Sequence, residues 1–175
     1  MELENKKILF ADLDGTLIQT ASGKTFAEDV TDFRIRKDVL DKIKCMDEMV
    51  FICIVTNQGG IPKYTPKHDF EAKLSAIIQF ITNYCNDNAE GSIEVFARYC
   101  ISEDGTNPNR KPNTGMLESI MNDELRWADK PFKDKANMLM IGDASGKDGQ
   151  FSDSDKVCAE RFGIDYLDVE DFLTC

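Results

Sequence analysis

The sequence of 175 residues lacks any long hydrophobic run. No stretch stays apolar over the roughly 20 residues that a bilayer-spanning helix needs. The apolar run nearest the amino end, Ile8–Ala11, is too short for the core of a signal peptide. We therefore expect no membrane partner, and a cytoplasmic location or, in a eukaryote, a nuclear one.

Histidine and closely spaced cysteines are also scarce. His68 is the only histidine, and the six cysteines are scattered without a Cys-x-x-Cys pair. Disulfide frameworks are typical of shorter secreted chains, so we interpret these cysteines as reduced thiols, several of them buried.

Basic residues are fewer than acidic ones, 21 against 32, which gives a net charge of −11. This excess of negative charge argues against a protein that grips nucleic acid by bulk charge, although a local basic groove stays possible. The chain is 42% hydrophobic and 30% charged, which excludes a disordered protein. Its length suggests a single domain over residues 1–175.

Short apolar runs alternate with longer amphipathic ones. The runs predict buried strands over Lys7–Ala11, Val50–Val55, Ile93–Ile101, Met138–Ile141 and Ile164–Leu167. Helical spacing predicts helices over Arg36–Met46, Phe70–Tyr84, Met116–Leu125 and Asp155–Phe162. The polar stretches Gln19–Phe33, Ser102–Asn113 and Gly142–Phe151 are predicted loops. This alternation indicates an α/β fold, a Rossmann-like three-layer sandwich with a mainly parallel sheet.

Four polar motifs are expected at the carboxyl edge of this sheet, where open α/β folds bind ligands. They are Asp12-Leu13-Asp14-Gly15-Thr16, Thr56-Asn57-Gln58, Arg110-Lys111-Pro112 and Gly142-Asp143. Alone, each motif is explained as well by a turn, a cap or a solvated side chain. Together they would bring three carboxylates, a hydroxyl and a lysine to one crevice. Clustered carboxylates suit Mg²⁺, which binds carboxylates together with a phosphate.

The motifs FADLDGTL, IVTNQ, RKP and MIGD, in this order, resemble those of the haloacid dehalogenase (HAD) superfamily of phosphohydrolases. Within it, the chain is most similar to the polynucleotide kinase 3′-phosphatase family. That similarity rests on DLDGTL, TNQGGI (Thr56–Ile61), RKPNTGM (Arg110–Met116) and IGDASGK (Ile141–Lys147), and it runs over nearly the whole chain. A HAD core occupies about this length, so the resemblance implies no large cap domain.

The resemblance implies a role for each matching residue. Asp12 would be the nucleophile, Asp14 the general acid and base, and Thr56, Asn57 and Lys111 the phosphate-binding residues. The Mg²⁺ ligands would be Asp12, the backbone carbonyl of Asp14, and Asp143.

Some nearby residues keep two interpretations. Asp148 is either a further metal-site carboxylate or part of a solvated turn. Asp155 matches the family motif, but Ser152-x-x-Asp155 is close to a capping box, and we favour that structural role. We interpret His68 as a solvated first-turn residue and Trp127 as packing under the loop at Pro131.

The resemblance implies a DNA 3′-phosphatase, which leaves a 3′-hydroxyl for a polymerase or ligase. Lys24, Arg34 and Arg110 would contact the substrate, unless these basic residues are simply scattered over the surface. No Walker-type G-x-x-x-x-G-K-[ST] motif occurs, so the 5′-kinase half of some relatives is not expected. The sequence indicates neither the strandedness of the substrate nor the oligomeric state.

Two alternatives stay open. The first is a small-molecule phosphatase resembling the histidinol-phosphate and heptose-bisphosphate branch, which usually carries a zinc loop before its RKP motif. Here the corresponding segment, Tyr99–Gly105, has one cysteine and no histidine, so we expect no zinc. The second is a phosphate-binding domain without turnover, which the presence of both Asp12 and Lys111 disfavours.

Overall fold

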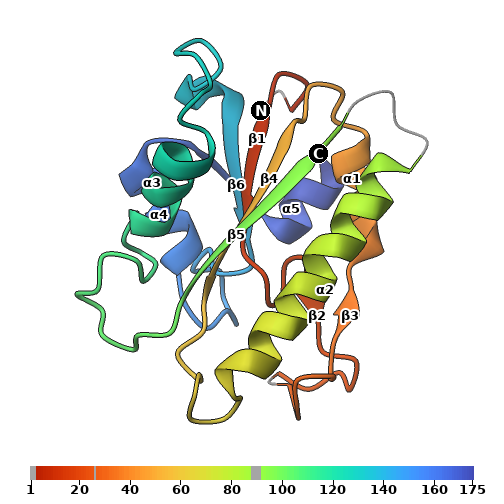
Figure 1. Cartoon of the computed structure of the whole chain (residues 1–175), viewed down its shortest axis with the longest axis vertical. Coiled ribbons are helices and arrows are strands. Elements are labelled where there is room, and N and C mark those ends of the chain that lie inside the picture. The colour runs from red at the N-terminus through yellow and green to blue at the C-terminus, as the bar shows by residue number, and fades with distance from the viewer. Residues whose placement is uncertain (1–2, 26, 88–91) are drawn as a thin grey trace.

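A parallel sheet forms the centre of the computed structural model, which describes residues 3–25, 27–87 and 92–175 (Figure 1). The five strands lie in the order β5-β4-β1-β6-β7, and every neighbouring pair is parallel. They are β1 (Ile8–Ala11), β4 (Phe51–Asn57), β5 (Glu94–Cys100), β6 (Met138–Gly142) and β7 (Asp165–Asp168). The predicted strands and their parallel arrangement are thus confirmed.

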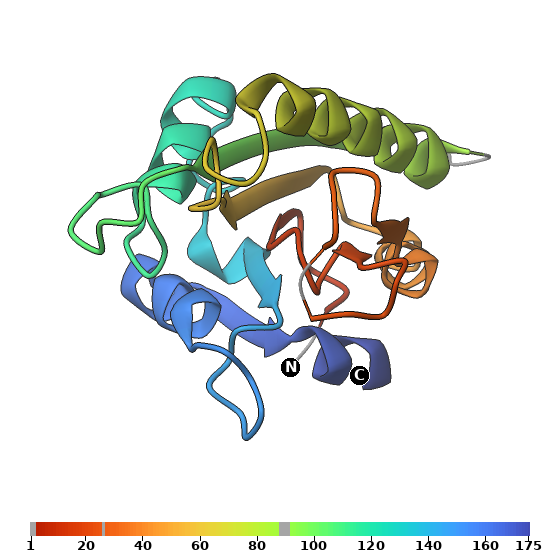
Figure 2. The same ribbon diagram turned by 90° about the horizontal axis from the view of Figure 1, so that it is seen from below.

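Helices cover both faces of the sheet (Figures 1 and 2). One face carries α1 (Lys37–Lys44), α2 (Lys67–Asn86) and α5 (Val169–Thr174), and the other carries α3 (Gly115–Ser119) and α4 (Ser154–Phe162). A π-helical turn, Ile120–Glu124, continues α3, and a 3₁₀ turn, Lys135–Asn137, precedes β6. The result is the predicted three-layer sandwich.

The alternation of side chains along each strand explains the two cores. In β1, Leu9 and Ala11 pack with α1, α2 and α5, whereas Ile8 and Phe10 pack with α3 and α4. All four side chains are fully buried. A strand covered on both faces must be apolar at every position, which is why β1 contains no polar residue. Burial of one such large side chain contributes about 1.5–3 kcal/mol.

Four short elements were not predicted. An antiparallel pair of two-residue strands, β2 (Ile18–Gln19) and β3 (Arg34–Ile35), flanks the expected loop Gln19–Phe33 and takes in only Gln19 of it. The six-residue α5 and the 3₁₀ turn are the other two. β2, β3 and the 3₁₀ turn have only two or three residues, too few to display a period, and α5 spans less than two helical turns.

The chain order places the loops that follow β1, β4, β5 and β6 at one edge. The chain starts in the middle of the sheet with β1, adds β4 and β5 on one side, and then crosses over to β6 and β7. Loops that leave β1 and its two neighbours therefore diverge around a crevice at their carboxyl ends. Figure 2 is viewed from this edge.

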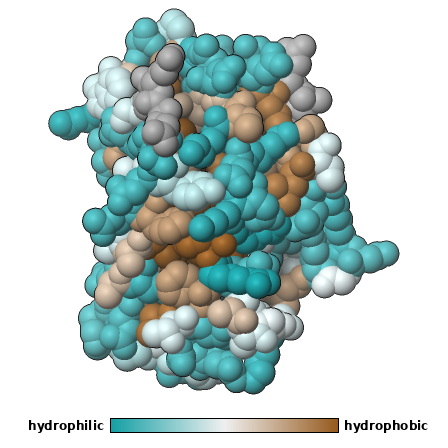
Figure 3. Space-filling model, turned by 90° about the vertical axis from the view of Figure 1, so that its right-hand side faces the viewer, coloured by the Kyte–Doolittle hydropathy of each residue, from teal (hydrophilic) through white to brown (hydrophobic). Residues whose placement is uncertain are grey.

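On the face that Figure 3 shows, apolar surface is visible among mostly hydrophilic side chains. Within the part of the chain that the structure describes, no helix is both long enough and apolar enough to cross a membrane.

Candidate active site

The turn after β1 carries Asp12 and Asp14 to the carboxyl edge. Leu13 between them is fully buried, which fixes the turn in the core. Gly15 has φ +83, a conformation that residues with a Cβ rarely adopt, and a Cβ there would lie 2.0 Å from Asp143 Oδ2. The glycine therefore lets the loop after β6 bring the Asp143 carboxylate up to this turn.

A buried lysine joins two of the acids. Lys111 is only 3% exposed, and its Nζ lies 2.5 Å from Asp12 Oδ1 and 2.7 Å from Asp155 Oδ1. Asn57 at the end of β4 fixes the loop that presents this lysine. Its side-chain amide donates to the backbone oxygen of Lys111 and accepts from the backbone nitrogen, both at 2.9 Å. Phosphate binding by Asn57 stays a prediction, and its contacts position Lys111.

Asp155 is a member of the site, which the capping interpretation missed. Helix α4 begins at Ser154 with Asp153 as its N-cap, and no side chain caps it by a hydrogen bond. The Asp155 carboxylate is 1% exposed and bonds to Lys111 and to the backbone nitrogen of Ala144. The expected capping role is therefore wrong. The family motif was the available signal for its place in the site.

Three carboxylates converge beside Lys111. One oxygen each of Asp12, Asp143 and Asp155 lies within 4.8 Å of the others. Gly142 makes this possible, because a Cβ there would lie 2.2 Å from Asp155 Oδ2. Asp148, the other acid considered for this site, sits in an exposed turn outside the cluster.

The cluster carries more negative charge than Lys111 neutralises. Burial raises the pKa of Asp12, Lys111 opposes this, and the charges of Asp155 and Asp143 raise it further. Burial and the charge of Asp155 raise the pKa of Asp143 to about 6. Burial alone would lower the pKa of Lys111, but Asp12 and Asp155 raise it, so the lysine stays cationic.

This donor set fits Mg²⁺. The ion prefers carboxylate oxygens, and a divalent cation would offset both the burial and the mutual repulsion that raise the pKa values of Asp12 and Asp143. Asp12 and Asp143, both predicted as ligands, contribute to the cluster, and Asp155 is the third acid.

Asp14 faces a different set of partners. Gln58 Nε2 donates to Asp14 Oδ2 at 2.7 Å and to Thr56 Oγ1 at 3.0 Å. Lys73 Nζ on α2 lies 4.0 Å from Asp14 Oδ1 and is largely buried. Gln58 and Lys73 thus belong to the surroundings of the predicted acid and base, and neither had been assigned a role from the sequence. Thr56 is buried near the end of β4, and its phosphate contact stays a prediction.

The predicted substrate contacts are spread over the rim of this edge. Lys24 pairs with Glu28 on the loop after β2, and Arg34 lies in β3. Arg110 Nη1 donates to the backbone oxygen of Ser102 at 2.8 Å, on the loop between β5 and α3. Their substrate contacts stay predictions.

For two residues away from the site, the structure confirms one prediction and contradicts the other. His68 is exposed in the first turn of α2, as predicted. Trp127 is not buried under the Pro131 loop, because 67% of it is exposed, although its ring contacts Phe51 edge to face at 5.9 Å.

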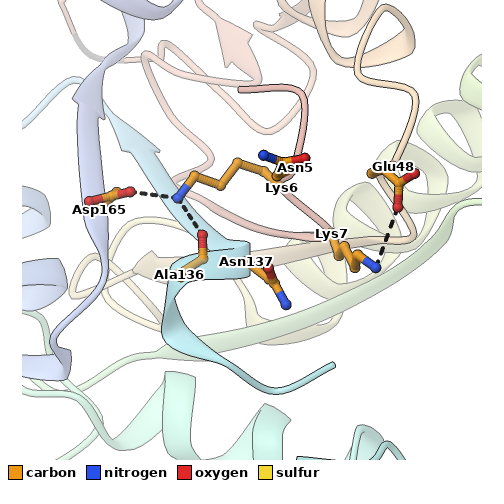
Figure 4. Close-up of a pocket in the computed structure, with 7 residues that line it drawn as sticks. All are labelled: Asn5, Lys6, Lys7, Glu48, Ala136, Asn137 and Asp165. Carbon is orange, nitrogen blue, oxygen red and sulfur yellow. Dashed lines mark hydrogen bonds and ion pairs between the residues drawn. The ribbon is translucent and has the colours of Figure 1, made fainter. Parts of the chain in front are cut away.

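A pocket of about 830 Å³ lies at the opposite, amino edge of the sheet (Figure 4). Its wall includes Lys6, whose Nζ lies 2.5 Å from Asp165 Oδ2, and Lys7, which pairs with Glu48 at 3.4 Å. None of the predicted site residues lines this pocket.

Comparisons with known proteins agree with the geometry of the carboxyl edge. A family model described as polynucleotide kinase 3 phosphatase matches residues 7–173. The chain belongs to the polynucleotide kinase 3 phosphatase family. Among the proteins similar to this family member is a bifunctional polynucleotide phosphatase/kinase of Schizosaccharomyces pombe, 32% identical over 173 residues, which are 97% of this chain and 38% of that protein.

The relatives extend beyond polynucleotide enzymes. The histidine biosynthesis bifunctional protein HisB of Legionella pneumophila is 31% identical over 177 residues, covering 94% of this chain and 41% of that protein. The chain thus spans about two fifths of the length of these curated relatives. The D,D-heptose 1.7-bisphosphate phosphatase of B. bronchiseptica, solved with magnesium and phosphate, superposes with a TM-score of 0.64 at 18% identity, covering 91% of this chain and 78% of that one. A putative HAD-like phosphatase of Mesorhizobium loti also superposes, with a TM-score of 0.60 at 24% identity over 91% of this chain and 69% of that one. The fold is accordingly that of HAD-like phosphatases, as predicted.

Proposed function

We propose that this protein is a Mg²⁺-dependent phosphomonoesterase that removes 3′-phosphates from DNA ends through an aspartyl-phosphate on Asp12. The observation that carries the proposal is the buried Asp12 held against Lys111 among three converging acids. A nucleophile of this kind must be fixed and desolvated, and its surroundings must accept the charge of a phosphate. Such a substrate places the enzyme in the cytoplasm, or in the nucleus of a eukaryote.

The first chemical step is attack by a carboxylate oxygen of Asp12 on phosphorus. The bond between phosphorus and the 3′ oxygen breaks, and Asp14 gives its proton to the leaving oxygen. In the second step Asp14 takes a proton from water as the water attacks phosphorus. This step releases phosphate and regenerates the Asp12 carboxylate.

The other side chains bind and orient the phosphate. The Lys111 ammonium has three N–H donors, of which Asp12 and Asp155 take two, so one is left for a phosphate oxygen. The Thr56 hydroxyl, which accepts a hydrogen bond from Gln58, would contact another oxygen of the phosphate. Asp12 and Asp143 would hold Mg²⁺, which supplies positive charge against the anionic substrate.

The family supports a polynucleotide substrate over the other phosphate esters. A direct test compares kcat/KM for a 3′-phosphorylated oligodeoxynucleotide, histidinol phosphate and a heptose bisphosphate, each with Mg²⁺. We expect the oligonucleotide to be preferred by at least about 100-fold, because binding energy from the rest of the strand lowers the barrier. Equal or greater kcat/KM for either small molecule would contradict the proposal.

A small-molecule phosphatase is the second candidate, and the similarity to HisB favours it. Against it stands the segment Tyr99–Gly105, which holds one cysteine and no histidine. That cysteine, Cys100, is buried, and among the described residues only the acids Asp12, Asp143 and Asp155 form a group of three or more His, Cys, Asp or Glu that could hold a metal ion. The same substrate comparison separates the two candidates.

A further inference from the structure

Apolar side chains are exposed on two adjacent loops at the rim of the site. Tyr64, on the loop after β4, is 75% exposed, and Ile101, directly after β5, is 41% exposed. The two loops start side by side, because Asn57 pairs with Cys100 in the sheet and the backbone nitrogen of Gln58 donates to the Cys100 oxygen at 2.7 Å. Exposed apolar side chains are unfavourable in water, so these two residues favour contact with an apolar group.

The loop that carries Tyr64 is tied to the catalytic residues. Backbone hydrogen bonds run from Ile61 to Gln58 at 3.1 Å and from Tyr64 to Gly60 at 2.7 Å, which form a compact turn. Gln58 at the start of this turn contacts both Asp14 and Thr56 through its side chain. The turn that carries Tyr64 therefore starts at a residue that contacts the site, and the Tyr64 ring is exposed on this turn.

Charge around this turn is of both signs. Lys63 Nζ lies 4.7 Å from the centre of the Tyr64 ring, and the side chains of Arg110 and Glu103 both lie beside Gly59. The whole chain has a net charge of −11. Attraction of a polyanion by bulk charge is therefore weak, and a strand must be held by local contacts. Stacking on an aromatic ring is a contact that every base can make.

We propose that Tyr64 is a stacking platform for the base of the 3′-terminal nucleotide, and this inference rests on the proposed function. Tyr64 acts on specificity and takes no part in the chemistry. It selects a phosphate that is attached to a nucleoside over one attached to a sugar alone. The Lys63 ammonium, which lies over the same ring, makes a further favourable contact with the strand to which the base belongs.

The test uses variants of the full chain and two 3′-phosphorylated oligodeoxynucleotides, identical except that one ends in an abasic residue. We expect Tyr64→Ala to raise KM for the normal oligonucleotide about tenfold with kcat unchanged, and Tyr64→Phe to behave as the native protein. On the abasic oligonucleotide, Tyr64→Ala and the native protein should have the same KM. Trp127→Ala is the matched control, since Trp127 is an exposed aromatic that contacts Phe51 at the amino end of β4.

Three outcomes would overturn the inference. They are an unchanged KM for Tyr64→Ala on the normal oligonucleotide, an equal loss on both oligonucleotides, and an equal loss for Trp127→Ala. These outcomes are distinct from failure of the proposed function, which shows in the native protein as poor turnover of both oligonucleotides relative to histidinol phosphate. Because Tyr64 is mostly exposed, an unchanged melting temperature is expected for its variants.

Discussion

Two buried lysines at opposite edges of the sheet form ion pairs of different kinds. At the amino edge, Lys6 Nζ contacts Asp165 and the backbone oxygen of Ala136, and the carboxylate of Asp165 is 47% exposed (Figure 4). At the carboxyl edge, Lys111 contacts two buried carboxylates and a third acid lies beside them. The charges of Lys6 and Asp165 balance each other, whereas Lys111 lies among three acids, which leaves an excess of negative charge. A buried lysine alone therefore does not indicate catalysis. A surplus of acids around the lysine does indicate it.

The largest effect is expected for Asp12→Asn, which removes the nucleophile. Activity should fall by at least about 10⁴-fold, because an amide oxygen does not form the acyl phosphate. The fold should persist, as the shape of the side chain is kept. Phosphate release from a 3′-phosphorylated oligonucleotide and the thermal unfolding midpoint measure both effects. At the amino edge, Asp165→Asn should leave kcat/KM unchanged, and a comparable loss there would remove the contrast between the two edges.

Removing each lysine sharpens the comparison. Lys111→Met should lower kcat/KM by about 10³-fold, because a fixed cation against the phosphate is lost. Lys6→Met should keep activity and lower stability by about 1–3 kcal/mol, a value reduced from that of a fully buried pair because Asp165 is half exposed. Denaturant unfolding and steady-state kinetics test the two variants. Equal kinetic losses in both would argue against the special role of Lys111.

Gly142→Ala should disturb the acids without changing any charge. The new Cβ would lie 2.2 Å from Asp155 Oδ2, so this carboxylate must move, and displacement near the chemistry by about 1 Å costs about 100-fold in rate. Gly105→Ala is the matched control, because no atom lies within 4 Å of a Cβ there. Steady-state kinetics of both variants decide the point. Full activity of Gly142→Ala would show that the position of Asp155 is unimportant.

Mg²⁺ and pH should have linked effects on the stability of the protein, because both act on the acids at the carboxyl edge. The pKa of Asp143 in the folded, metal-free protein is raised to about 6 from 3.8, so its contribution to stability is present below pH 4 and is lost as the pH rises through 6. Mg²⁺ binds the deprotonated acids and should reverse this loss at pH 7.5, where a concentration of ten times Kd would raise the melting temperature by about 3–6 °C. The increase should shrink at pH 5.

Melting curves at the two pH values, with and without Mg²⁺, measure this linkage. Chelation of the metal should also abolish activity. Asp143→Asn should lose the Mg²⁺ response, and Asp165→Asn should keep it. An equal response of the native protein at both pH values would contradict the assignment of the acids.

The sequence predicted the strands and the carboxyl edge because both follow from simple periodicity. Runs such as Ile8–Ala11 must be apolar when both faces are buried, and parallel strands deliver their polar ends to one edge. The contacts of Asp155 could not be derived from local spacing. Ser152-x-x-Asp155 fits a capping pattern, and only the packing of α4 against β6 shows that the carboxylate points at Lys111.

The partners of Asp14 were hidden for the same reason. Gln58 lies 44 positions from Asp14 in the sequence, and Lys73 is on a helix whose periodicity reports only its apolar face. Tertiary contacts of single polar side chains have no period, so no pattern in the sequence predicts them. The fold could therefore be anticipated almost completely, whereas the site could be anticipated only in its motif residues.

The central claim is that Asp12 becomes phosphorylated during turnover. The most direct measurement is to quench the native protein with acid during turnover of a 3′-phosphorylated oligonucleotide and reduce the acyl phosphate with borohydride. Peptide mass spectrometry should then find homoserine at position 12 and at no other aspartate. Phosphate release at full rate without homoserine at position 12 would contradict the account.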